Sequence, residues 1–70
     1  MGLAKKVRIL LIERGMTQVK LAAKLGITPA TLNDKLVRDN LSERDLVKIA
    51  DALDCDFEAC FVLRDTGKRI

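Results

Sequence analysis

Apolar residues recur every three or four positions through four stretches of this chain, the spacing at which side chains line one face of an α-helix. These stretches cover residues 3–14, 18–25, 29–38 and 43–53, and short polar or glycine-containing segments separate them. Four helices joined by short turns predict a compact bundle. The positions expected to face its core are Leu3, Val7, Leu10, Leu11, Leu21, Ala22, Leu25, Ile27, Leu32, Leu36, Leu46, Ile49, Ala50 and Leu53.

The segments between these stretches carry helix-capping residues. Thr17 and Thr28 each precede a helix, where a threonine hydroxyl can accept a free backbone N–H. Pro29 falls at the first helical position, and Gly26 follows the second helix, where the backbone turns left-handed. Residues 42–45, Ser-Glu-Arg-Asp, resemble a capping box. Residues 17–38 are therefore predicted to form two short helices joined by a tight turn, the pattern of a DNA-reading helix-turn-helix.

The last sixteen residues follow a different pattern. Apolar and polar residues alternate from Phe57 to Arg64, which favours a β-strand, and Asp65-Thr66-Gly67 supplies turn chemistry. A helix over residues 55–63 is the competing interpretation. A lone strand leaves its backbone groups unpaired, so we expect it to pair with the same strand of a second copy in a two-fold dimer. The strand residues predicted at this interface are Phe57, Ala59, Phe61 and Leu63.

Ile9 and Ile12 lie off the apolar stripe of the first helix. Apolar residues on a polar flank can mark a second contact surface, so both are further candidates for the dimer interface. Isolated isoleucines are also common on protein surfaces that form no interface.

Composition narrows the function classes. Seventy residues make one small domain, and the net charge of +3 suits a nucleic-acid partner without requiring one. Cys55 and Cys60 have no histidine to accompany them, so we expect no metal site, no cysteine nucleophile and no enzyme. Reduced thiols are favoured over a strained local disulfide. With no apolar run of about 18 residues and no secretory signal, we expect a cytoplasmic protein without membrane contact, cofactor or small-molecule ligand.

Residues 7–53 resemble the Cro/repressor-type helix-turn-helix family, also called the xenobiotic-response-element family of bacterial and phage regulators. The resemblance implies a mainly α fold, a four-helix lambda-repressor-like bundle, with a short C-terminal β-strand or hairpin. It implies a helix-turn-helix domain at residues 1–54, a β extension for dimerisation at 55–70, and sequence-specific binding of double-stranded DNA by a homodimer that controls transcription. The matching residues are Thr17, Gln18, Leu21, Ala22, Leu25, Gly26, Ile27, Thr28, Leu32, Ile49, Ala50 and Leu53.

Two positions depart from that family's pattern. Many members carry a buried Arg–Glu pair where this chain has Leu11 and Leu36. Replacing such a pair by matched apolar groups is often neutral or stabilising. The family also usually has an apolar residue at the position of Lys35, so the apolar position has moved to Leu36, which would roll the third helix about its axis.

With Leu32 and Leu36 facing inward, the opposite side of the third helix is the surface predicted to enter the major groove. The expected base-reading residues are Pro29, Ala30, Thr31, Asn33 and Asp34, with Asn33 suited to an adenine edge. The expected phosphate contacts are Thr17, Gln18, Thr28, Lys35, Arg38 and Asn40. Asp34 can accept from a cytosine amino group or can pair with Arg38 one turn on, and both interpretations stay open.

The predicted function is a transcriptional repressor acting as a homodimer. The alternative is a protein-interaction module or an antitoxin-like partner, because helix-turn-helix folds are sometimes reused without DNA. The absence of Arg and Lys from the start of the third helix supports that alternative.

Overall fold

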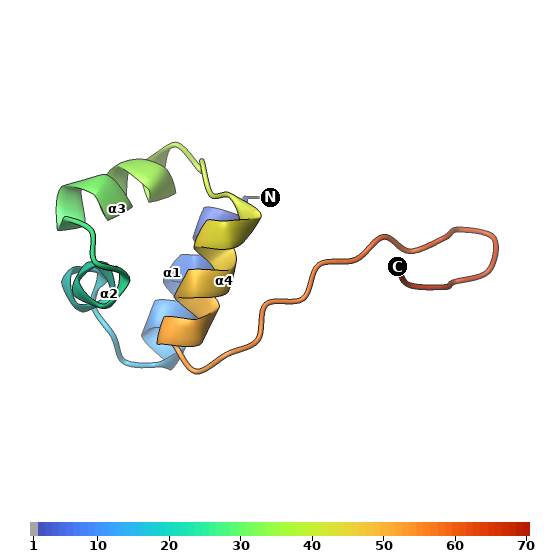
Figure 1. The fold of residues 1–70 in the computed structure, drawn as a ribbon, viewed down its shortest axis with the longest axis horizontal. Helices are drawn as coiled ribbons and strands as arrows, with labels where there is room; N and C mark the ends of the chain where they lie inside the picture. Colours follow the sequence, from blue (N-terminus) through green and yellow to red (C-terminus); the bar gives the residue numbers. More distant parts are fainter. Residues whose placement is uncertain (1) are drawn as a thin grey trace.

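All four predicted helices form, and each end lies within about a residue of its expected position. The computed structural model describes residues 2–70 and contains α1 (Leu3–Glu13), α2 (Gln18–Leu25), α3 (Pro29–Val37) and α4 (Glu43–Ala52). α2 and α3 lie at one end of the molecule, and the C-terminal segment leaves α4 and projects from the opposite side (Figure 1). Within residues 2–70, no helix combines the length and the hydrophobicity needed to cross a bilayer.

The predicted caps define the helix ends. The Thr17 hydroxyl accepts a hydrogen bond from the Lys20 backbone N–H, and the Thr28 hydroxyl accepts one from the Thr31 N–H, both at 3.2 Å. Gly26 has φ +73°, a left-handed conformation in which a Cβ is penalised. Ser42 and Asp45 form the complete capping box at the start of α4. Short-range chemistry therefore sets where α2, α3 and α4 begin.

The apolar face of each helix packs into one core. Leu11 and Leu36, which replace the family's charged pair, are both buried in it. Leu3 departs from prediction: it is partly exposed, and Ala4 is buried in its place. The reason is helix geometry: Ala4, Val7 and Leu11 lie at i, i+3 and i+7 on one face of α1, and Leu3 lies beside that face. The buried residues of this core are Ala4, Val7, Leu11, Leu21, Ala22, Leu32, Leu36, Leu46, Ile49 and Leu53.

The N-terminus of α1 is capped from a distant part of the sequence. Gly2, at the N-cap position, has no side chain with which to cap the helix. Instead the Asp39 carboxylate, just after α3, accepts a hydrogen bond of 2.9 Å from the Ala4 backbone N–H. A negative charge here also opposes the positive end of the helix dipole. Asp39 has φ +53°, and a Cβ on Gly2 would overlap its carboxylate. This contact joins α1 to the end of α3.

We expect Gly2→Ala to lower the free energy of unfolding by about 1 kcal/mol, since the added methyl group displaces the Asp39 cap. Asp39→Gly, which tolerates the positive φ but cannot cap, should cost about as much. Urea unfolding of both single variants and the double variant checks this. The double variant should be no less stable than either single one, and additive losses would show that Gly2 and Asp39 act independently.

The predicted C-terminal β-strand is wrong for the residues described here. None of residues 2–70 belongs to a strand, and the segment contains one isolated antiparallel bridge, between Val62 and Arg69. The competing helix over residues 55–63 does not form either. Residues 61–63 and 68–70 do exchange backbone hydrogen bonds around a tight turn. The alternating pattern thus yields a rudimentary hairpin, because two short arms without a third neighbour give too little pairing for a stable sheet.

The beginning of this C-terminal segment is fastened to the bundle. Arg14, at the end of α1, donates hydrogen bonds from Nη2 to the Asp54 carbonyl at 3.1 Å and to the Cys55 sulfur at 3.5 Å. These contacts raise the pKa of the Arg14 guanidinium, with the Cys55 hydrogen bond as the largest cause. Phe57 then packs in the groove between α1 and α4. Beyond Phe57, every residue to Ile70 is exposed.

Candidate nucleic-acid interface

The candidate interface is the outer surface of α3 together with the N-terminus of α2. The turn at Gly26 brings α3 across α2, and α3 lies along the edge of the bundle (Figure 1). The C-terminal segment leaves from the other side of the molecule, so it does not cover α3. The helix that would enter a groove is accessible along its outer side.

Packing fixes which side of α3 faces outward. Leu32 and Leu36 are each only 1 % exposed, so the predicted inward pair is confirmed. The family's usual apolar position, here Lys35, is only partly buried. The five predicted base readers, Pro29, Ala30, Thr31, Asn33 and Asp34, are all exposed on one helix.

Two of these five side chains already have partners within the helix. The Thr31 hydroxyl lies 2.8 Å from the Thr28 hydroxyl, which also serves as the helix cap. The Thr31 methyl group remains available for a thymine methyl. The Asp34 carboxylate lies 3.0 Å from Nε of Arg38, four residues on, so in the free protein these two side chains form the predicted ion pair. Both groups are mostly exposed, and such a pair contributes only a few tenths of a kcal/mol. It can therefore open at little cost when either group meets DNA.

Lys35 connects α3 to α4. Its ammonium group lies 3.2 Å from the Asp45 carboxylate, and both side chains are about one-third exposed. Asp45 also accepts a hydrogen bond from the Ser42 backbone N–H, and this bond is the largest cause of the lowered pKa of Asp45, ahead of Lys35. Lys35, which the sequence predicts as a phosphate contact, thus has a partly exposed partner on α4 in the folded chain.

We expect Asp45→Asn to reduce the loss of unfolding free energy that the protein suffers as the pH is lowered. The pKa of Asp45 is lower in the folded chain than the value of about 3.9 in an unfolded one. Its ionised form therefore contributes stability that is present above about pH 4 and is lost as the pH falls through the folded pKa. Urea unfolding from pH 7 to pH 2.5 should show a smaller loss for Asp45→Asn than for wild type. Asp51→Asn, an exposed control on the same helix, should follow the wild-type profile.

The start of α2 forms the second part of the interface. Thr17 is exposed and Gln18 is partly buried. Thr17 accepts from the Lys20 N–H, which leaves the earlier N–H groups of this turn directed outward along the helix axis. A helix N-terminus is an anion site, and phosphate oxygens are suitable ligands for it. Gln18 and these amides can position a DNA strand without reading its sequence.

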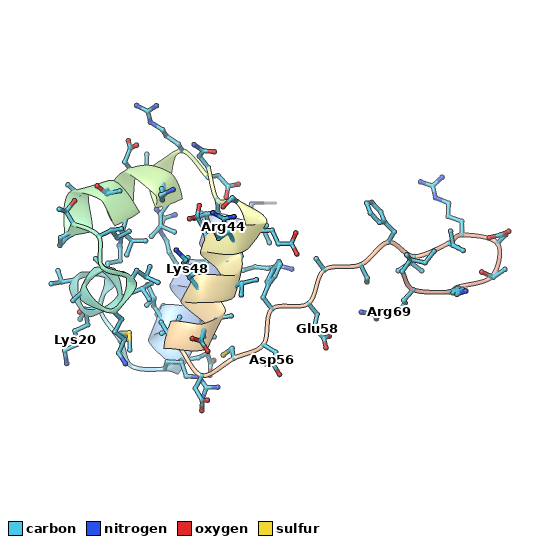
Figure 2. The ribbon with its side chains drawn as sticks, in the orientation of Figure 1. Lys20, Arg44, Lys48, Asp56, Glu58 and Arg69 are labelled. Atoms are coloured by element: carbon cyan, nitrogen blue, oxygen red, sulfur yellow. The ribbon has the colours of Figure 1, made fainter. Side chains whose placement is uncertain are left out.

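The structure adds basic residues that the sequence analysis did not select. Arg44 and Lys48 are exposed one turn apart on α4 (Figure 2). Lys48 lines an open depression together with Lys24 of α2 and Asp51 of α4, so two ammonium groups and one carboxylate border this region. The i, i+4 spacing of Arg44 and Lys48 was a usable signal. The same helix also carries Leu46, Ile49 and Ala50 at core spacing, and this apolar pattern is the stronger signal in its sequence.

The predicted dimer residues divide into three groups. Phe57 is partly buried against its own bundle, whereas Ala59, Phe61 and Leu63 are exposed on the C-terminal segment. Ile9 and Ile12 are also exposed but lie outside the groove that Phe57 occupies. Ile12 projects about 180° from Leu3, which lines that groove. These apolar surfaces are therefore separate in one chain.

Within the described part of the chain, no cluster of three or more His, Cys, Asp or Glu residues could hold a metal ion. Cys55, which is partly buried, and Cys60, which is exposed, are free thiols.

The candidate interface as a whole offers exposed polar and small side chains on α3, flanked by helix N–H groups and basic residues. This is the chemistry of a surface that binds duplex DNA.

Comparison with known proteins agrees with this geometry. The family model of the Cro/C1-type HTH DNA-binding domain matches residues 6–62. No curated protein and no solved structure matches the chain significantly. The chain belongs to the Cro/C1-type helix-turn-helix family, a family of DNA-binding domains rather than of enzymes. It is a DNA-binding transcription regulator whose partner is double-stranded DNA.

Proposed function

We propose that the protein is a repressor that binds its operator as a homodimer, with α3 in the major groove of each half-site. The observation that supports this most directly is the orientation of α3. Leu32 and Leu36 are buried while the opposite side of the same helix is exposed and lies away from the C-terminal segment. Occupying a groove excludes other proteins from those base pairs, so binding alone is sufficient for repression at a promoter.

Within this proposal, the N-terminal half of α3 reads bases. Asn33 takes an adenine edge through two hydrogen bonds, and Ala30 and the Thr31 methyl group contact thymine methyls. Asp34 reads cytosine only if it leaves Arg38, which would then be free for a phosphate. Asn33 is the residue on this face best suited to specify one base.

The surrounding groups hold the DNA backbone. Thr17, Gln18 and Thr28 lie at helix N-termini, while Arg38 and Asn40 lie at the far end of α3. We add Arg44, which is exposed in the first turn of α4, just beyond that end (Figure 2). Contacts at both ends of α3 fix its angle in the groove.

The helical bundle and the C-terminal segment are proposed to have different roles. The bundle, residues 1–54, is proposed as the DNA-binding part, and residues 55–70 as the dimerisation part. The support is that residues beyond Phe57 leave large apolar side chains in water, with Phe61 81 % exposed. Exposed apolar surface of this kind commonly marks an interface.

Salt dependence tests the proposal. If Arg38 and Arg44 of both copies neutralise four phosphates, affinity for an operator duplex should fall about a hundredfold between about 50 and 200 mM salt. Fluorescence anisotropy with a fragment selected from random duplexes measures it. Arg44→Ala should weaken binding to all sequences and reduce the slope, whereas Lys68→Ala, in the C-terminal segment, should change neither. Binding that does not respond to salt would contradict the proposal and favour a protein-interaction module.

A further inference from the structure

Val37, the last residue of α3, is an apolar residue that the core does not use. Its side chain is 66 % exposed, whereas Leu36, its neighbour in the same helix, is 1 % exposed. Exposed valines are ordinary on protein surfaces, and Val19 and Val47 are two others on this chain. What distinguishes Val37 is its place on the helix that the proposed function puts in the major groove.

The helical repeat places Val37 in the middle of the proposed reading face. Successive residues of an α-helix lie about 100° apart around its axis. Val37 therefore projects about 20° from Ala30 and about 40° from Asn33, and it lies between the two. Asp34 and Thr31 lie further round the same face, and both already have partners in the free protein. When Ala30 and Asn33 meet base edges, Val37 faces those edges as well.

α3 is short enough to keep both of its ends at the bases. Its nine residues span about 13 Å, close to the width of the major groove, about 12 Å. The helix lies along the edge of the bundle (Figure 1), and groups proposed to hold phosphates lie at both of its ends. Held at both ends, the helix keeps Val37 as close to the groove as Ala30.

The rise of the helix sets the spacing of the bases that it meets. At about 1.5 Å per residue, Val37 lies about 6 Å beyond Asn33 along the helix axis and about 10 Å beyond Ala30. Base pairs of B-DNA are stacked about 3.4 Å apart. Val37 is therefore about two base-pair steps from the base of Asn33 and about three from that of Ala30.

The chemistry of valine selects one feature of the groove. Its two methyl groups neither donate nor accept hydrogen bonds, so a base donor or acceptor covered by them would lose water without gaining a partner. The C5-methyl group of thymine is the apolar feature that base pairs present in the major groove. Burial of one methyl group corresponds to about a fourfold gain in affinity.

We infer that Val37 is a specificity-determining residue that contacts a thymine methyl group about two base-pair steps beyond the adenine read by Asn33. Each operator half-site then carries three A·T pairs at fixed spacing, met in order by Ala30, Asn33 and Val37. This inference rests on the proposed function. It adds a residue to the reading face and specifies the spacing of the bases.

Removing thymine methyl groups from the DNA tests the contact. Deoxyuridine keeps the hydrogen-bonding groups of thymine and lacks only the C5-methyl group. In an operator selected from random duplexes, each thymine of one half-site is replaced in turn, and fluorescence anisotropy measures binding. Wild type should lose about fourfold in affinity at the position met by Val37, whereas Val37→Ala should lose nothing there.

Cytosine methylation gives a second readout at the same position. With 5-methylcytosine there, wild type should bind about fourfold more tightly than with cytosine, because the methyl group occupies the same place in the groove. Val37→Ala should bind the two duplexes equally.

Val37→Ala should itself weaken operator binding about tenfold, since both copies lose the contact, and leave binding to random duplex unchanged. The fold should keep its stability, because the side chain is exposed and alanine favours a helix more than valine. Val47→Ala is the matched control. Val47 is an exposed valine on α4 and projects about 160° from Asp45, the residue that meets α3, so this variant should bind every duplex as wild type does.

The outcomes separate this inference from the proposed function. If Val37→Ala binds the operator as tightly as wild type, or retains the wild-type pattern of deoxyuridine losses, Val37 does not read a thymine methyl group. A selective loss for Asn33→Ala on the operator would leave the proposed function standing in that case. A chain that selects no duplex from random DNA overturns both.

Discussion

Leu36→Glu should unfold the bundle at room temperature or leave it only marginally folded. Leu36 is 1 % exposed at the contact of α3 with the core, so the substitution buries a carboxylate with nothing to pair with. An uncompensated buried charge costs about 3–5 kcal/mol. A 70-residue chain has roughly 4–10 kcal/mol of stability in total. Circular dichroism during urea unfolding measures the loss.

Adding Leu11→Arg to Leu36→Glu provides the matched control. Leu11 is buried in the same core, and the resemblance implies that related proteins hold an arginine and a glutamate at these two positions. The double variant should regain a substantial part of the lost stability, although not all of it, because an ion pair also pays a desolvation cost. Leu11→Arg alone should be as damaging as Leu36→Glu. If the double variant were less stable than both single ones, the two side chains would not be close enough to compensate each other.

Asn33→Ala should weaken binding to the operator by about tenfold to a hundredfold and leave binding to random duplex nearly unchanged. Asn33 is exposed on the outer side of α3, and a bidentate contact to adenine is lost when its amide is removed. Competition binding with the selected operator and with mixed-sequence DNA measures the two affinities. The stability of the fold should not change, since Asn33 contributes nothing to the core.

Gln18→Ala is the contrasting variant for this experiment. A residue at the N-terminus of α2 that holds phosphates should weaken binding to both DNA samples by a similar factor. An equal loss for Asn33→Ala on operator and random DNA would show that Asn33 positions the protein without reading a base.

The helices of this protein were predictable because local chemistry decides them. Thr17, Thr28 and Pro29 set helix starts, and Gly26 sets a helix end, through interactions within a few residues. The apolar spacing then identifies nearly the whole core, since a helix face is a property of sequence period. The exposed face of α3 follows from the same spacing once Leu32 and Leu36 are placed inward.

The contacts between distant segments could not be predicted in this way. Asp39 caps α1 across 35 positions of sequence, and nothing in either segment alone specifies the other. Lys35 meets Asp45, ten positions on, only because the fold brings α3 beside the start of α4. Arg14 likewise meets Cys55 across 41 positions.

By itself, the sequence determined the four helices, the caps of α2, α3 and α4, the buried face of each helix and membership of the helix-turn-helix family. Only the tertiary structure decided which charged side chains pair between helices, and that the alternating C-terminal segment remains without a stable sheet. The physical reason is the range of the interactions. The local caps and the helix faces depend on neighbours within one or two turns, whereas the Asp39 cap, ion pairs between helices and strand pairing depend on which distant surface is brought alongside.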